Sequence, residues 1–230
     1  MKKTILLIII VLAFGCRLHS SKEKSALTDK ERHYCDSLQI DTSIISLLRQ
    51  YTSSTVDPFH YSRSRELLSD GTEKELEPVY LQGLVFKETA QNTEIILEEL
   101  SKSFKDKGYL LFILDRNFDI SNKPDVMGIL KMTDKYQVLT SIKTNGTNYD
   151  IDTDSLVNII KFFDNKYSLD LIGAGGDWCE FKINKEPTDW LALAQEAYKF
   201  CPDIVDQGAG TVDALAEEMK KNKRLYFWWD

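Results

Sequence analysis

The sequence predicts an α/β (α+β) sandwich, a mixed β-sheet with helices packed on it, that follows a signal peptide and a flexible tether. Apolar runs such as residues 109–115 suit strands covered on both faces. They alternate along the chain with amphipathic stretches such as residues 153–165, which have the spacing of a helix. Hydrophobic residues make up 43% of the 230-residue chain, and this is enough for a sizeable core.

The first residues have the pattern of a secretory signal peptide. Lys2 and Lys3 precede an apolar run over residues 4–14, which is shorter than the roughly 20 residues needed to cross a bilayer. Cys16 follows the small residue Gly15, as in a lipobox, where the cysteine thiol is acylated before the signal peptide is cleaved. Lipidation at Cys16 is the favoured interpretation because no better small-residue cleavage site lies nearby.

The lipobox pattern is incomplete, and this leaves a second interpretation open. Lipoboxes usually carry Leu at the third position before the cysteine and a small residue at the second, whereas this chain has Ala13 and Phe14. The alternative is an ordinary signal peptide followed by an incidental cysteine. With lipidation, we expect an exported lipoprotein of the cell envelope, anchored to a membrane and facing the periplasm or the cell surface.

The patterning divides the chain into four expected segments. These are a lipoprotein signal peptide (1–15), a lipidated cysteine with a flexible tether (16–40), a short helix and an irregular segment (41–82), and an α/β domain (83–230). In the last segment we expect strands at 84–87, 109–115, 136–143, 169–172, 178–183 and 225–229, and helices at 92–107, 153–165, 188–200 and 211–221. Residues 126–132 fit either type.

Charge and histidine content exclude several classes of function. The formal net charge of −7 repels phosphate backbones, so we expect no nucleic-acid partner. His19, His33 and His60 all precede residue 83, so a histidine-dependent nucleophile or a histidine-based metal site is not expected in the main domain. We expect no cofactor and no resident metal, with a divalent cation as a weaker alternative.

The remaining cysteines give no sign of a metal site. None of Cys35, Cys179 and Cys201 belongs to a CxxC pair, so a zinc knuckle or a thioredoxin motif is not expected. One disulfide would leave one thiol over. We favour Cys179 and Cys201 as small buried core residues, with Cys201 on the inner face of the helix at 188–200.

Four blocks in the second half carry a resemblance to a known family. They are TNGTNYD at 144–150, GAGGDW at 173–178, FCPDIVDQG at 200–208 and the closing WWD at 228–230. In this order they resemble the bacterial domain-of-unknown-function family 4253, and weaker similarity reaches back to about residue 83. The family brings no known activity, so the resemblance implies no cofactor, partner or catalytic residue.

The first of these blocks to weigh for chemistry is the glycine-rich one. Residues 173–176 could suggest a phosphate-binding loop, but such loops need a helix immediately after them. Residues 178–183 instead alternate like a strand, so a turn between two strands is favoured.

The connection at 202–210 carries Asp203, Asp206 and Gln207 between two expected helices. The two carboxylates could bind a hard cation, or act as acid and base with Asp177 or Glu180. The helix start that follows could hold an anion, although the nearby acids oppose this. The favoured interpretation is structural, with both carboxylates accepting backbone amide hydrogen bonds in a turn.

The paired tryptophans near the end of the chain suggest a contact surface. Adjacent residues of a strand face opposite sides, so one of Trp228 and Trp229 should be in the core. The other could serve as a platform for a partner or a sugar, because Trp is favoured at binding hot spots. The candidate ligand or partner residues are Asp177, Trp178, Glu180, Asp203, Asp206, Gln207, Trp229 and Asp230.

Two hypotheses for function follow from these features. The first is a non-catalytic binding module of the cell envelope, held to the membrane by its lipid and contacting an envelope protein or a surface ligand. The alternative is a carboxylate-dependent hydrolase or cation-binding enzyme that uses the Asp and Glu residues named above.

Overall fold

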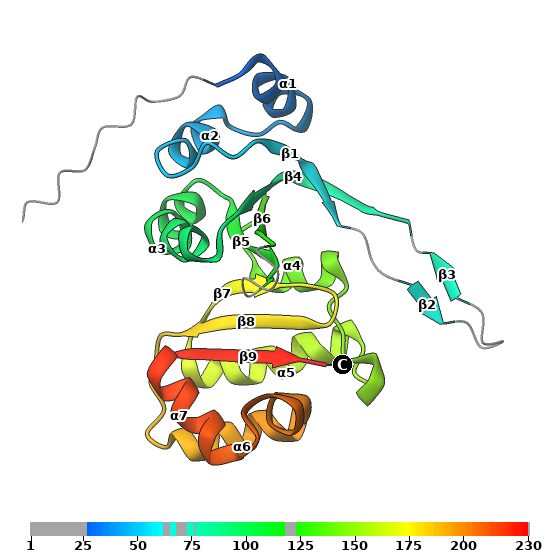
Figure 1. Cartoon of the computed structure of the whole chain (residues 1–230), viewed down its shortest axis with the longest axis vertical. Coiled ribbons are helices and arrows are strands. Elements are labelled where there is room, and N and C mark those ends of the chain that lie inside the picture. The colour runs from blue at the N-terminus through cyan, green and yellow to red at the C-terminus, as the bar shows by residue number, and fades with distance from the viewer. Residues whose placement is uncertain (1–26, 62–64, 68–72, 76, 118–122, 230) are drawn as a thin grey trace, which may run out of the picture.

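The computed structural model describes residues 27–61, 65–67, 73–75, 77–117 and 123–229 of the chain. A seven-stranded mixed sheet runs in the order β1-β4-β6-β5-β7-β8-β9, with helices packed on both faces (Figure 1). The predicted fold class is therefore confirmed. No helix among the described residues is long and apolar enough to cross a membrane.

The sheet strands are β1 (Val56–Tyr61), β4 (Val79–Glu88), β5 (Leu110–Asp115), β6 (Asp125–Leu130), β7 (Leu169–Ala174), β8 (Trp178–Ile183) and β9 (Arg224–Trp228). The helices are α1 (Asp29–Leu38), α2 (Thr42–Leu48), α3 (Ala90–Asp106), α4 (Lys135–Ile142), α5 (Thr153–Tyr167), α6 (Trp190–Phe200) and α7 (Val212–Asn222). A 3₁₀ turn, η2 (Thr147–Tyr149), and a π-helical turn, η3 (Ile204–Ala209), connect them. β2 (Arg65–Leu67) and β3 (Glu73–Glu75) form a separate pair at the end of the β1–β4 arm (Figure 1).

Two hydrophobic cores lie on opposite faces of the sheet. Side chains of a strand alternate between faces, and β5 shows the result. Leu111 and Ile113 join the core beneath α1, α2 and α3, whereas Phe112 and Leu114 join the core beneath α4 to α7. The prediction that 109–115 is a strand covered on both faces is thus confirmed.

Several sequence predictions hold at the level of single elements. The expected helices at 92–107, 153–165, 188–200 and 211–221 correspond to α3, α5, α6 and α7, and the strand at 178–183 matches β8. Of the ambiguous segment at 126–132, residues 126–130 lie in strand β6. The glycine-rich stretch forms the turn of a β7–β8 hairpin, as predicted. Cys179 and Cys201 are both fully buried and free.

The predicted strand at 136–143 is wrong, because this segment forms helix α4. Its apolar residues fit both periodicities, since Val138, Leu139 and Ile142 also lie on one face of a helix. The Asp134 side chain accepts a hydrogen bond from the Tyr136 amide, and Lys143 closes the helix in the left-handed conformation. The capping residues therefore decide between the two patterns.

The expected organisation before residue 83 also needs correction. Helix α1 occupies residues 29–38 of the predicted tether, and its Thr28 forms a capping box with Glu31. The segment predicted to be irregular contains β1, which pairs with β4 along most of its length. Residue 83 falls inside β4, so the sheet extends across the expected boundary. Cys16 lies outside the described residues.

Strands β5 and β7 are adjacent and parallel, and one close approach defines their seam. Only Ile113 and Gly173 are paired in register. A Cβ on Gly173 would lie 3.0 Å from the Ile113 carbonyl oxygen and 2.7 Å from Cζ3 of Trp178. The seam therefore requires glycine at this position.

Replacing Gly173 with alanine should destabilise the protein by about 2 kcal/mol, because the added methyl group overpacks the seam. Gly208→Ala is a suitable control, since a Cβ there would meet its nearest neighbour at an ordinary 3.6 Å. Urea unfolding monitored by circular dichroism measures both changes. Equal stabilities for the two variants would contradict the proposed role of the seam.

Candidate functional site

A cavity of about 950 Å³ opens at the edge of the sheet where β4, β5, β7 and β9 end. After β5 the chain continues into β6 on one side, and after β7 it continues into β8 on the other. Two adjacent parallel strands whose connections diverge leave a crevice at their carboxyl ends, where α/β proteins commonly bind ligands. Asp115, the last residue of β5, and Arg116 line the cavity at the end of that strand, and Gly176 and Asp177 line it after β7.

Three aromatic side chains from β8 and β9, Trp178, Tyr226 and Trp228, line one wall of the cavity; we refer to them as the aromatic floor. Trp178 is paired in register with Trp228. The ring centroids of Trp178 and Tyr226 are 6.1 Å apart, and the two planes are tilted by 34°. Burial, followed by the charges of Glu180 and Asp177, raises the pKa of Tyr226, so its phenol stays protonated and can donate a hydrogen bond.

The backbone of Trp228 is held by a buried thiol. The Cys201 thiol donates to the Trp228 carbonyl oxygen at 2.8 Å, and the Trp228 amide donates to Cys201 Sγ at 3.3 Å. Burial raises the pKa of this thiol to about 12, so it keeps the proton that it donates. Cys201 thus fixes the end of β9 that carries the aromatic floor.

Trp228 and Trp229 face opposite sides of the sheet. Trp229 is 3% exposed, and its indole Nε1 donates to the Phe200 carbonyl oxygen at 3.1 Å. Trp228 is half-buried and lines the cavity. Of the two tryptophans, Trp228 is therefore placed to meet a ligand, whereas the candidate Trp229 lies in the core.

Four charged side chains form a network beside the cavity, which we call the Arg–Glu network: Glu94, Arg116, Glu180 and Arg224. Arg116 donates to Glu180 at 2.8 Å and to Glu94 at 3.1 Å. Arg224 donates to Glu180 at 2.9 Å and contacts both carboxylate oxygens of Glu94. Glu180 is 7% exposed, so Arg116 and Arg224 together neutralise a buried carboxylate. The bonds to Glu180 and Glu94 in turn hold Arg116 at the cavity wall.

Opposing effects set the pKa values in this network. Burial alone would raise the pKa of Glu94, but the hydrogen bonds and charges of Arg224 and Arg116 outweigh it and lower the value. Burial opposes the positive charge of Arg224, yet its bonds to Glu94 and Glu180 raise its pKa further. Glu94 and Arg224 are therefore both charged near neutral pH.

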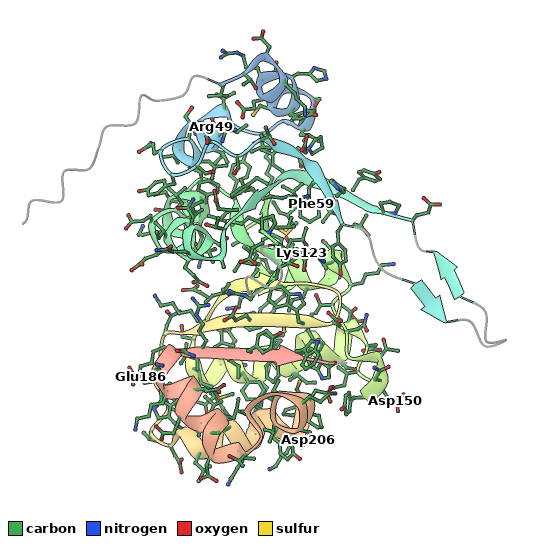
Figure 2. All side chains as sticks on the ribbon, in the orientation of Figure 1. Arg49, Phe59, Lys123, Asp150, Glu186 and Asp206 are labelled. Atoms are coloured by element: carbon green, nitrogen blue, oxygen red, sulfur yellow. The ribbon has the colours of Figure 1, made fainter. Side chains whose placement is uncertain are left out.

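The acids of η3 have a different environment. Asp203 is 3% exposed and accepts from the Tyr149 hydroxyl at 2.6 Å and from Gln207 Nε2 at 3.0 Å. Asp206, which Figure 2 labels among the C-terminal helices, accepts from the Tyr198 hydroxyl at 2.9 Å. The bond to Asp203 raises the pKa of Tyr149 to about 12, which keeps it a donor. Side chains of Tyr149, Gln207 and Tyr198 therefore help to hold the two carboxylates in place.

The structure separates the predicted carboxylates into distinct groups. Asp177 and Trp178 meet in the cavity, and Glu180 lies beside it in the Arg–Glu network. Cys179 and Phe181 point toward the core that contains η3, so Glu180 faces away from Asp203. Among the residues that the structure describes, no cluster of three or more His, Cys, Asp or Glu could hold a metal ion. Asp230 lies outside the described residues.

The four blocks that carry the family resemblance meet in space. Thr144 Oγ1 donates to the Gly175 carbonyl oxygen at 2.7 Å, and the Trp229 amide donates to that of Asp177 at 3.0 Å. Gly146 lies against the Trp229 ring, where a Cβ would approach Cγ to 2.8 Å. Together with the Tyr149–Asp203 bond, these contacts join all four blocks at one end of β7, β8 and β9.

Residues 126–230 match the model of a family described as Domain of unknown function (DUF4253). The resemblance is therefore confirmed. The match begins in β6 and covers slightly less than half of the chain. No curated protein and no solved structure matches the chain. The DUF4253 region supplies the aromatic floor, and residues before it supply Lys87, Asp115 and Arg116 on the other side of the cavity.

Sequence reasoning missed several cavity residues, and their signals differ. Asp115 is the last residue of a buried strand and Arg116 follows it, so both could have been expected at a carboxyl end of the sheet. Tyr226 and Trp228 could not be predicted as cavity residues without knowing which side of β9 faces the cavity. His60 precedes residue 83, yet it lies on β1 of the main sheet and lines the cavity.

Replacing Glu94 with glutamine should lower the free energy of unfolding at pH 7 by about 1 kcal/mol, a modest loss because the side chain is partly exposed and solvent-screened. Because the pKa of Glu94 is lowered in the folded state, its contribution is present above the ordinary value of 4.5 and is lost as the pH falls through the folded value. The difference from wild type should therefore shrink on acidification.

The control is Glu98→Gln on the same helix, since Glu98 is exposed. Urea midpoints at pH 7, 5 and 3 would provide the comparison. A stability difference for Glu94→Gln that stays constant over this range would show that the carboxylate charge is not what stabilises the network.

Proposed function

We propose that this protein is a membrane-anchored lipoprotein of the cell envelope that works as a non-catalytic binding module, with its ligand in the cavity at the ends of β5 and β7. The single observation that carries the proposal is the position of that cavity. It lies where the connections of two adjacent parallel strands diverge, and it combines an aromatic floor with charged groups at its rim.

The surroundings of the cavity support binding by a preformed site. Arg116 is held by two carboxylates, and the backbone of Trp228 is held by Cys201. Side chains and backbone that are already fixed lose little conformational freedom when a ligand binds. The arrangement therefore suits recognition of a defined small ligand or the end of a larger one.

A second candidate is a carboxylate-dependent hydrolase. One observation favours it, because His60, Asp115 and Asp177 all line the same cavity. Such groups could transfer protons to and from a bound substrate. The two functions differ in the fate of the ligand, because an enzyme releases altered molecules and a binding module returns its ligand unchanged.

The lipid anchor is the first part of the proposal to test. Cells that express the wild-type chain should incorporate a fatty-acid analogue into the protein, and Cys16→Ser should abolish this labelling and release the protein from the membrane fraction. Cys35→Ser is the control, since Cys35 is buried in the fold and should not be acylated. An unlabelled wild-type protein would reduce the proposal to simple export.

Ligand binding can be tested without knowing the ligand. The full-length protein, extracted from its native envelope in mild detergent, should carry a molecule that mass spectrometry detects after denaturation. Trp228→Ala should reduce its recovery at least about tenfold, as expected for a central aromatic contact. Trp190→Ala, which changes a tryptophan on α6 outside this cavity, should leave recovery unchanged.

Two outcomes would count against the binding module. Equal recovery from both tryptophan variants would place the ligand elsewhere. A molecule that the wild-type protein converts, but that Asp115→Asn or Asp177→Asn returns intact, would favour the hydrolase.

A further inference from the structure

We infer that the ligand of this cavity is a saccharide, bound with a sugar ring stacked on the aromatic floor and its hydroxyl groups at the charged rim. The inference rests on the proposed function, because it names the chemical class of the ligand for the same cavity. The arguments are the shape of the aromatic floor, the balance of charge at the rim and the size of the cavity.

The aromatic floor has the geometry of a platform rather than of a cage. Tyr226 and Trp228 are half-buried and supply its open ring surface. Trp178 is 9% exposed and supports Tyr226, with ring centroids 6.1 Å apart and planes tilted by 34°. Cages for organic cations instead surround the charge with several ring faces. A shallow platform suits a flat ligand face, and the C–H groups on one face of a pyranose ring pack well on electron-rich aromatic faces.

The rim of the cavity carries charges of both signs. Asp115 and Asp177 are exposed carboxylates, and Lys87 is an exposed cation on the opposite side. The charge of Arg116 is balanced by Glu94 and Glu180. A ligand with a single strong charge would be attracted by some of these groups and repelled by others.

Hydroxyl groups fit such a mixed rim, because each one both donates and accepts hydrogen bonds. Asp115 and Asp177 can accept from sugar hydroxyls, and Lys87 can donate to them. Two tyrosines add phenol groups. Tyr226 remains protonated, and the Tyr61 hydroxyl lies against Gly176 at the cavity wall, where a Cβ would approach it to 2.5 Å.

The size of the cavity is consistent with more than one sugar ring. Its volume of about 950 Å³ is near the upper end of the roughly 300–1,000 Å³ that is typical of small-molecule sites. The aromatic floor lies on one side of the cavity. Asp115 and Lys87 lie on the other side, which is formed by strands that precede residues 126–230. A short oligosaccharide can therefore contact both sides at once.

Isothermal titration of the full-length protein in detergent tests the inference. The probes are chitotetraose, maltotetraose, cellotetraose and glycan fragments released from the producing cell's own envelope. Spermidine and inorganic phosphate serve as cationic and anionic comparisons. We expect at least one saccharide to bind and neither charged comparison to compete with it.

Variants at the floor and the rim link binding to the cavity. Trp228→Ala and Asp177→Asn should each weaken saccharide binding by about tenfold or more. Trp190→Ala and Asp106→Asn should stay within about twofold of wild type, since both residues lie outside the cavity. Circular dichroism spectra would confirm that each variant is folded.

The possible failures are distinguishable. If no saccharide in the set binds, or if the cavity variants bind it as well as wild type does, the saccharide inference is overturned. Recovery of a different class of ligand from the native envelope would then leave the binding module standing. If no ligand is recovered from the native envelope and no saccharide binds, the proposed function is overturned as well.

Discussion

The close approach of β5 and β7 at Gly173 is the constraint on which the rest of the structure depends. Gly173 lies against the Ile113 carbonyl oxygen and the Trp178 ring, so the two halves of the sheet can join in parallel only without a side chain there. The parallel seam places the carboxyl ends of two strands side by side while their connections diverge. The cavity follows from this geometry. The absence of a side chain at Gly173 also leaves room for the Trp178 ring beneath the cavity.

The Arg–Glu network crosses the same seam and resists its separation. Glu94 on α3 and Arg116 after β5 come from the first half of the chain, whereas Glu180 and Arg224 come from β8 and β9. Removing one charge would leave its partners incompletely neutralised at a partly buried position, which lowers the stability of the fold. The network therefore couples the position of the cavity wall to the packing of α3.

Local patterns predicted many elements, but not the assembly of the site. The apolar stripe on α5 and the alternation along β8 were sufficient to predict these two elements. The apolar residues of α4 fitted both a helix and a strand, and the Asp134 cap favours the helix. Asp177 and Trp178 were predicted as candidates and do line the cavity. The role of Glu180 depends on Arg116, 64 residues away, and such long-range pairing has no local signal.

The four blocks of the family resemblance act mainly as the support of the cavity. Trp229 packs on Gly146 and binds the Phe200 carbonyl oxygen, and its amide holds the turn that presents Asp177. Because strand side chains alternate, fixing Trp229 in the core obliges Trp228 to face the cavity. The opposite side of the cavity comes from strands that precede the matched region. A change at Asp115 or Lys87 would therefore leave the floor in place, whereas a change at Gly146 or Trp229 would disturb the floor itself.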